Sequence, residues 1–130
     1  MKLLLDAHTL LWLVAGDPKL STQAKSSIAD PANDLFLSVG SIWELAIKTT
    51  KPKQKLELSE PLKTYLTRWT TTYQINVLAI EFPHALKVAE LADHHRDPFD
   101  RILIAQAMVE NMALVSGDEK FTMYPVPVIW

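Results

Sequence analysis

Residues 94–107 read HHRDPFDRILIAQA and join an acidic turn to an apolar run. Pro98 suits the first position of a helix, because its missing N–H would have no partner there, and Asp97 before it is a suitable N-cap. Asp100 then falls in the first turn. Residues 102–109 carry a single strongly polar side chain, so this helix is expected to pack on more than one side. The stretch therefore predicts a buried helix with two carboxylates at its N-terminal end.

The composition limits the classes of protein to which the chain can belong. With 130 residues it is long enough to bury one core, so residues 1–130 are expected to form a single domain. It has no cysteine, which excludes disulfides and zinc–thiolate sites and agrees with a cytoplasmic location. No apolar run approaches the ~18 residues of a membrane span, so no membrane partner is expected. A net charge of −2 is unlike that of a strongly basic nucleic-acid binder.

Short apolar runs alternate with helical patterns along the chain. The predicted strands are residues 3–5, 35–39, 75–80, 112–116 and 125–130. The predicted helices are residues 9–15, 21–29, 41–50, 60–73, 83–93 and the one that begins at Pro98. This alternation indicates βαβ units, and thus an α/β fold with a mainly parallel central sheet and helices on both faces. The prolines of the last segment favour an edge strand.

Four acids fall where strands end or helices begin. Asp6 closes the first strand, and Asp118 follows the strand that ends at Ser116. Glu44 and Asp100 are expected in the first turns of two helices. Ligands of open parallel sheets bind at the carboxyl ends of the strands, so these side chains can point at one region from separate parts of the chain.

Each acid also has a local structural explanation. Ser41 and Glu44 have the spacing of a capping box, and Glu44 can pair with Lys48 one helical turn later. Asp97 and Asp100 have the same cap spacing, and Asp118 can cap a turn that begins at Glu119.

Asp6 is the acid that local rules explain least. A carboxylate at the end of an apolar strand must be paired, hydrated or ligated, and no cation lies near it in the sequence. Carboxylates that share a cleft repel one another unless a divalent cation lies among them. Hard oxygen donors without cysteine favour Mg²⁺, with Mn²⁺ as a substitute, over zinc.

Four stretches of the chain resemble the successive motifs of the PIN-domain family. They are LLLDAHTLLW (residues 3–12), SIWELAIK (41–48), HRDPFDRILIAQA (95–107) and LVSGDEKF (114–121). Within the family, the match is to the VapC-type ribonuclease toxins of bacterial toxin–antitoxin pairs. The chain departs from their pattern in having Ala7 and Ser116 where these toxins commonly have threonine.

The resemblance implies a three-layer α/β/α fold and a divalent-metal-dependent endoribonuclease that leaves a 5′-phosphate and a 3′-hydroxyl. It implies an acidic cluster that binds the metal, made of Asp6, Glu44, Asp100 and Asp118, with Asp97 as an auxiliary residue. It further implies a cognate antitoxin, whose C-terminal segment lies over the acidic cleft and supplies a competing cation, and a homodimer.

Further residues are given supporting roles by this hypothesis. Ser41 and Ser116 are expected to orient water or a carboxylate. Contact with RNA phosphates is expected from four lysines, namely Lys48, Lys51, Lys53 and Lys55. Trp43 is expected in the core, whereas Leu11 and Trp12 can belong either to the core or to the antitoxin groove.

Three alternatives remain at this level. A metal-free nuclease could use His94 and His95 as acid and base, but adjacent residues at a helix end point apart, and both are expected to be exposed or to match a helix C-terminus. A receiver-like binding module also gathers acids and Mg²⁺ at strand ends, although Asp6 lacks the adjacent acid. A PIN-like domain without catalysis could bind its partner alone.

Overall fold

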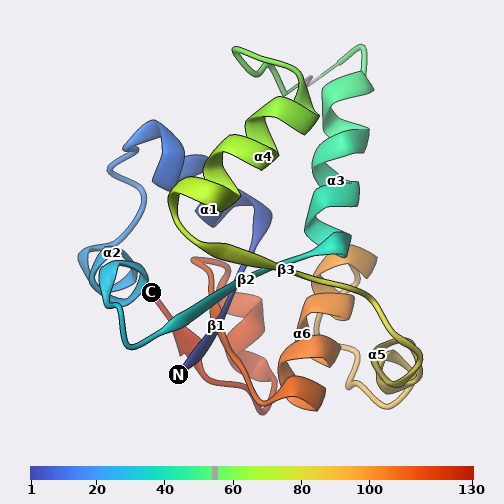
Figure 1. Cartoon of the computed structure of the whole chain (residues 1–130). Coiled ribbons are helices and arrows are strands. Elements are labelled where there is room, and N and C mark those ends of the chain that lie inside the picture. Colours follow the sequence, from blue (N-terminus) through green and yellow to red (C-terminus); the bar gives the residue numbers. More distant parts are fainter. Residues whose placement is uncertain (54–55) are drawn as a thin grey trace.

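A five-stranded parallel sheet forms the centre of the molecule (Figure 1). The computed structural model describes residues 1–53 and 56–130. The strand order is β3-β2-β1-β4-β5, and every neighbouring pair is parallel. The strands are Lys2–Leu5 (β1), Asp34–Ser38 (β2), Ile75–Leu78 (β3), Ala113–Val115 (β4) and Val128–Ile129 (β5). The predicted parallel sheet is confirmed, and the proline-containing last segment is an edge strand as predicted.

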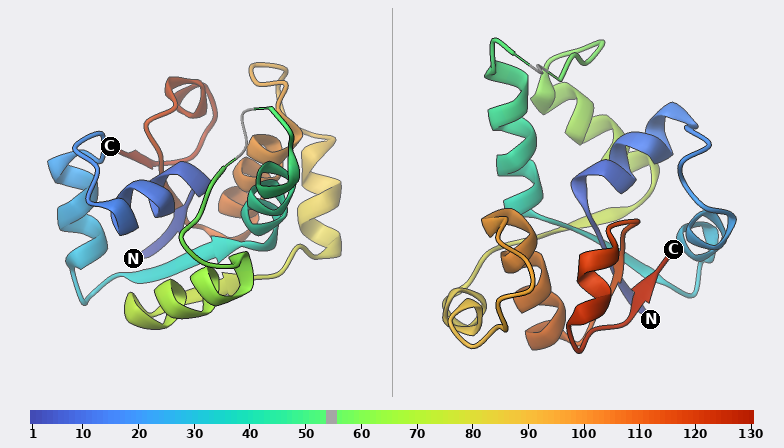
Figure 2. Two further views of the ribbon diagram at one scale, coloured as in Figure 1. Left: turned by 90° about the horizontal axis from the view of Figure 1, so that it is seen from above. Right: turned by 180° about the vertical axis from the view of Figure 1, so that it is seen from behind.

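Helices cover both faces of this sheet (Figure 2). They are Ala7–Ala15 (α1), Thr22–Ala29 (α2), Val39–Thr50 (α3), Leu62–Thr72 (α4), Phe82–Val88 (α5), Pro98–Glu110 (α6) and the 3₁₀ helix Glu119–Met123 (η1). The three-layer α/β/α architecture is therefore confirmed.

The central strand β1 contributes to both layers of the core. Leu3 and Leu5 pack with residues of α1 and α2, whereas Leu4 between them packs with α6 and with Phe121 of η1. Successive side chains of a strand point to opposite faces, and all three leucines are fully buried. The short apolar run is thus the centre of the fold, and Asp6 follows it directly.

Helix α6 has the predicted start and the predicted burial. Asp97 is its N-cap and Pro98 its first residue. Five consecutive residues, 103–107, are buried, which requires neighbours on more than one side. One of them is Gln106, whose amide nitrogen donates to the carbonyl of Ala79 at 3.2 Å.

Helix α3 begins two residues earlier than predicted. The hydroxyl of Ser38 accepts from the N–H of Gly40 at 3.0 Å, so Ser38 is the N-cap and Val39 the first helical residue. Glu44 therefore lies beyond the first turn, and the predicted cap pairing with Ser41 is wrong. The predicted pairing of Glu44 with Lys48 is confirmed, at 3.4 Å.

Two further predictions from periodicity are wrong. Helix α5 ends at Val88 rather than near Asp93, because the guanidinium of Arg101 binds the carbonyls that follow, including those of Leu91 and Ala92. Trp43 is not in the core but 60% exposed, on the outer side of α3 against the ring of Phe99. By contrast, Trp12 packs against the core and the ring of Trp130.

Among the helices in residues 1–53 and 56–130, none has both the length and the apolar character to span a membrane.

Candidate metal centre

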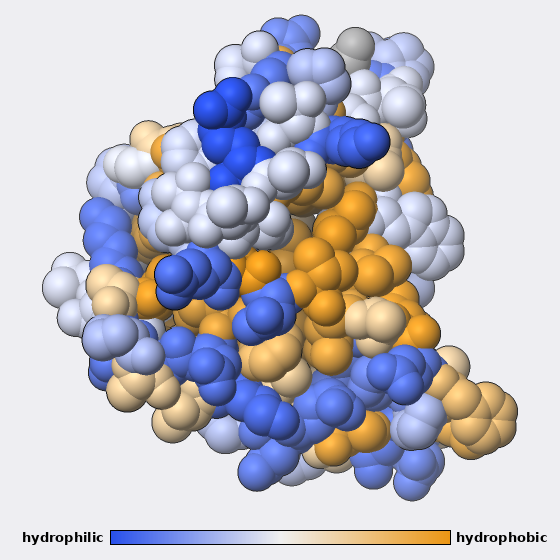
Figure 3. Space-filling view, viewed as in Figure 1, coloured by the Kyte–Doolittle hydropathy of each residue, from blue (hydrophilic) through white to orange (hydrophobic). Residues whose placement is uncertain are grey.

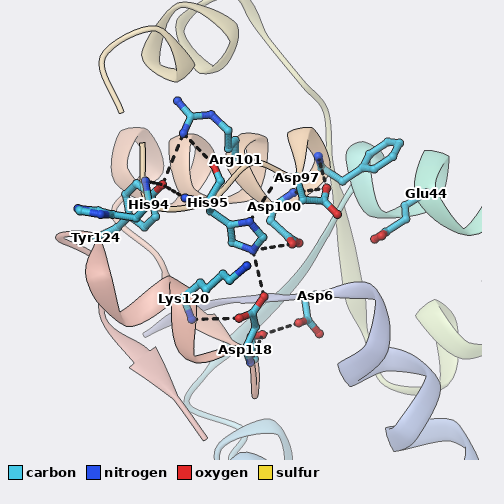
Figure 4. A network of polar contacts seen from close by, with 12 residues as sticks. Asp6, Glu44, His94, His95, Asp97, Asp100, Arg101, Asp118, Lys120 and Tyr124 are labelled. Atoms are coloured by element: carbon cyan, nitrogen blue, oxygen red, sulfur yellow. Dashed lines mark hydrogen bonds and ion pairs between the residues drawn. The ribbon is translucent and has the colours of Figure 1, made fainter. Parts of the chain in front are cut away.

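The predicted acids come together at the carboxyl ends of the central strands (Figure 4). Asp6 follows β1, and Asp118 lies three residues beyond β4. Asp100 enters from the first turn of α6. Glu44, on α3, points toward the same region from the side. Four segments far apart in the sequence thus supply one cluster of carboxylates.

The carboxylate of Asp6 is held from two sides. Its Oδ1 accepts from the N–H of Thr9 at 2.7 Å, which makes Asp6 the N-cap of α1. Its Oδ2 accepts from the hydroxyl of Ser116, and that hydroxyl accepts from the N–H of Asp118 at 3.1 Å. Ser116 therefore orients Asp6, in keeping with the supporting role expected for it.

Asp118 is held in a similar way. Its Oδ1 accepts from the N–H of Lys120 at 3.0 Å, so it caps η1 as its spacing predicted. Its Oδ2 lies 3.0 Å from Nε2 of His95. Burial acts to raise the pKa of Asp118, but the hydrogen bonds from Lys120 and His95 outweigh it and leave that pKa below its ordinary value.

Asp100 has the opposite electrostatic character. Burial raises its pKa most, followed by repulsion from Asp97; His95 lowers it, and Glu44 and Asp118 raise it further. The pKa of Asp100 is raised to about 7 as a result. A carboxyl that resists ionisation in this way gains most from a cation placed beside it.

Asp97 acts on α6 through its side chain. Its Oδ1 accepts from the N–H of Phe99 at 2.8 Å and from that of Asp100 at 3.3 Å. The predicted N-cap is confirmed, and the capped turn carries Asp100.

His95 is the site residue that the sequence interpretation missed. The sequence predicts that it is exposed or matches a helix C-terminus, yet it is 6% exposed, and its Nε2 lies 2.9 Å from Oδ2 of Asp100 and 3.0 Å from Oδ2 of Asp118. The prediction was wrong because α5 ends before this residue, so His94 and His95 lie in a loop rather than at a helix terminus. Only His94 is exposed.

Arg101 and Tyr124 support that loop and were also missed. Arg101 donates to the carbonyls of Val88 (3.2 Å), Leu91 (3.4 Å), Ala92 (3.0 Å) and His95 (3.1 Å). The hydroxyl of Tyr124 accepts from the N–H of His95 at 2.8 Å. The apolar run that follows Arg101 in the sequence is a sign that this part of the helix is buried and that the arginine bonds to protein rather than to solvent.

The remaining predicted residues lie at varied distances from the cluster. Ser41 is buried, and its Oγ has no hydrogen-bond partner among the described residues. Lys48 pairs with Glu44. Lys51 and Lys53 are exposed beyond the C-terminal end of α3, the end away from the sheet (Figure 1), and Lys55 lies outside the described residues.

The donor set suits a hard divalent cation. One ligand atom each from His95, Asp100 and Asp118 lie within 4.8 Å of one another, and the carboxylates of Asp6 and Glu44 face the same region. Carboxylate oxygens are the donors that Mg²⁺ and Mn²⁺ prefer. The unpartnered hydroxyl of Ser41 adds a buried polar group that a bound water could satisfy.

Comparison with models of known protein families shows to which family the chain belongs. The model of the family described as "PIN domain" matches residues 3–126. The chain belongs to the PIN-domain family. The family resemblance of the four motifs is confirmed, and a PIN domain replaces the receiver-like alternative.

Several solved structures share this fold, among them a toxin–antitoxin complex from Klebsiella pneumoniae. VapBC2 from Rickettsia felis, bound to a promoter DNA fragment, contains a chain with a TM-score of 0.73 and 15% identity, covering 98% of this chain and 97% of that one. A chain of VapBC-1 from nontypeable Haemophilus influenzae has a TM-score of 0.68 and 17% identity, and the match covers 98% of this chain and 96% of that one. A chain of FitAcB from Neisseria gonorrhoeae has a TM-score of 0.62 and 19% identity, and the match covers 97% of this chain and 95% of that one. At these identities the likeness shows a common fold. No curated protein matches the chain in sequence.

Proposed function

We propose that this PIN domain is a divalent-metal-dependent endoribonuclease that acts as the toxin of a toxin–antitoxin pair in the cytoplasm. The observation that carries the proposal is the convergence of Asp6, Glu44, Asp100 and Asp118 from four separate segments. No local rule of helix capping requires that convergence. Burial and the neighbouring carboxylates together raise the pKa of Asp100 to about 7, which supports a site that a cation would stabilise.

The four carboxylates are the residues that hold Mg²⁺ or Mn²⁺ in this proposal. The chemistry expected of either ion here is a lower pKa for the attacking water and neutralisation of charge on the phosphate and leaving oxygen. Cleavage then leaves a 5′-phosphate and a 3′-hydroxyl. The protein itself contributes position: Asp97 caps the turn that carries Asp100, and Ser116 orients Asp6.

RNA cleavage by carboxamide variants tests the proposal. Asp6→Asn and Asp100→Asn each keep the size of the side chain and remove one metal-binding charge. Each is expected to lower cleavage at least 100-fold in Mg²⁺ or Mn²⁺, and EDTA is expected to abolish cleavage by the wild type. Asp34→Asn, at an exposed position at the amino end of β2, is the matched control and should cleave normally. Wild-type cleavage rates in both site variants would reject the acidic-cluster mechanism. Absence of cleavage by the wild type would favour the alternative of a PIN domain that binds its partner without catalysis.

The fold relatives support an antitoxin as the partner. We propose that its C-terminal segment lies over the acidic cleft and places a cation among the carboxylates. Addition of the protein encoded by the neighbouring reading frame should then inhibit cleavage, and truncation of its tail should restore cleavage.

An apolar surface supports a homodimer. Apolar residues gather around β3 and the helices beside it (Figure 3). Val77 on β3, Phe82 and Leu86 on α5, and Trp43 on α3 are each more than half exposed, at 55%, 76%, 54% and 60%. Light scattering of the purified chain should give twice the monomer mass, and Leu86→Glu should give the monomer.

A further inference from the structure

The imidazole of His95 lies between two of the acids proposed to hold the metal. Its Nε2 is 2.9 Å from Asp100 and 3.0 Å from Asp118, and the side chain is almost fully buried. A ring nitrogen at this position can act in one of two ways. It can offer a lone pair to the metal, or it can donate a proton to the carboxylates.

The other ring nitrogen decides between these two roles. Nδ1 of His95 lies 3.3 Å from the backbone N–H of Asp97, and because that N–H can only donate, Nδ1 is the acceptor of this hydrogen bond. In a neutral imidazole one nitrogen accepts and the other donates. Nε2 is therefore the N–H nitrogen, and its hydrogen points at the two carboxylates.

The rest of His95 is fixed as firmly as its ring. Its backbone N–H donates to the hydroxyl of Tyr124 at 2.8 Å, and its carbonyl accepts from Arg101 at 3.1 Å. Its ring lies 5.7 Å from the ring of Phe121. Because these contacts already fix the imidazole of His95, little conformational entropy is lost when its N–H donates to the carboxylates.

We propose that His95 is a positioning residue that holds the carboxylates of Asp100 and Asp118 together through its Nε2–H and does not itself bind the metal. The proposal rests on the function proposed above, because it concerns the same acids. Without this donor, two carboxylates that repel each other are free to separate, and the site must be reassembled each time a cation binds.

Near-isosteric substitutions separate the donor from the shape of the side chain. His95→Gln keeps an N–H near the position of Nε2, whereas His95→Met fills a similar volume without a donor. His94→Gln and His94→Met are the matched controls, because His94 is the exposed neighbour. Thermal unfolding in EDTA establishes that each variant is folded.

The readout is the binding of Mn²⁺, followed by electron paramagnetic resonance. His95→Met is expected to weaken Mn²⁺ binding about tenfold, the size of effect expected when a hydrogen bond to a charged group is lost. His95→Gln should stay within about threefold of the wild type by the same reasoning, and both His94 variants should match it. Pulsed spectra of the wild type should show no coupling to a directly bound nitrogen.

Two results would overturn the proposal. One is a direct nitrogen coupling in the wild type, which would make His95 a ligand; the other is equal Mn²⁺ affinity in His95→Met and wild type. Failure of the proposed function alone gives a different result. In that case Mn²⁺ binding still depends on His95, but the wild-type protein does not cleave RNA. A wild type that does not bind Mn²⁺ contradicts both proposals.

Discussion

At the scale of single residues, Asp100 shows how a site can work against stability. The carboxyl of Asp100 has a pKa of about 7 in the folded protein, against an ordinary value of 3.8. The folded state therefore binds the proton more tightly than the unfolded state does. Linkage requires that the free energy of unfolding fall as the pH rises from about 4 to about 7.

Asp100→Asn should remove that pH-dependent loss. In EDTA, the variant is expected to exceed the wild type in free energy of unfolding by about 1–3 kcal/mol at pH 8, with a smaller difference at pH 5. Urea unfolding at the two pH values measures the difference, and Mn²⁺ should stabilise only the wild type. Asp34→Asn serves as the control. Equal stability of Asp100→Asn and wild type at pH 8 would show that the carboxylate is not under electrostatic strain.

Asp97 has a different role from Asp100, three residues away. Asp97→Ala should lower the free energy of unfolding by about 1 kcal/mol, because α6 loses its cap. Asp97→Ser should restore most of that stability, because serine also caps helices well, and should bind Mn²⁺ nearly as the wild type does. A large loss of Mn²⁺ affinity in the stable serine variant would instead identify Asp97 as a ligand.

At the scale of elements, the loop between α5 and α6 is organised by Arg101. Its guanidinium binds four carbonyls of residues 88–95, and those bonds replace the helical ones that α5 no longer makes. Arg101 lies next to Asp100 in the sequence, so it could be mistaken for a residue that contacts RNA. Its contacts show that it binds the protein's own backbone.

Arg101→Ala should therefore destabilise the protein by about 1–3 kcal/mol, since three partly buried carbonyls and one exposed carbonyl lose their partner. It should also weaken Mn²⁺ binding, because the loop that carries His95 is released. Arg96→Ala, at an exposed position in the same loop, is the control. Urea unfolding and Mn²⁺ titration measure both effects. An Arg101→Ala protein of normal stability but weak RNA binding would assign this arginine to phosphate contact.

Local rules predicted much of the fold, because strands, helices and caps depend on neighbours in the sequence. The alternation of strands and helices, the capped start of α6 and the burial of its middle were all readable in this way. The set of acids was predicted instead from their positions at strand ends and helix starts and from the resemblance to the PIN-domain family. His95 was missed because Asp118, one of the acids it contacts, lies 23 residues away, and no periodicity predicts that contact. Trp43 was assigned to the wrong side because a helical pattern does not tell which apolar residues find a neighbour.

At the scale of the whole molecule, charge is divided between two regions. The acids gather at the carboxyl ends of the strands, while Lys51 and Lys53 are exposed beyond the far end of α3. An RNA that reaches both regions must extend along α3, which is about 18 Å long for its 12 residues.

Removal of these two lysines should weaken RNA binding more at low salt than at high salt. Each phosphate contact contributes about 0.7 to the slope of log affinity against log salt for a single strand, so Lys51→Ala with Lys53→Ala should lower the slope by about 1.4. Fluorescence anisotropy in Ca²⁺, which is expected to allow binding without cleavage, measures it. Lys2→Ala with Lys25→Ala, at exposed positions elsewhere, is the control pair. An unchanged slope would remove these lysines from the RNA path.

The central claim is that the clustered acids cut RNA through a divalent cation, and the ends of the cut RNA test it most directly. The partner-free protein is incubated with end-labelled RNA in EDTA and then in excess Mn²⁺. The account predicts intact RNA in EDTA, and fragments with 5′-phosphate and 3′-hydroxyl ends after Mn²⁺ is added. Cleavage that continues in EDTA and leaves 2′,3′-cyclic phosphate ends would contradict it and would point to histidine chemistry instead.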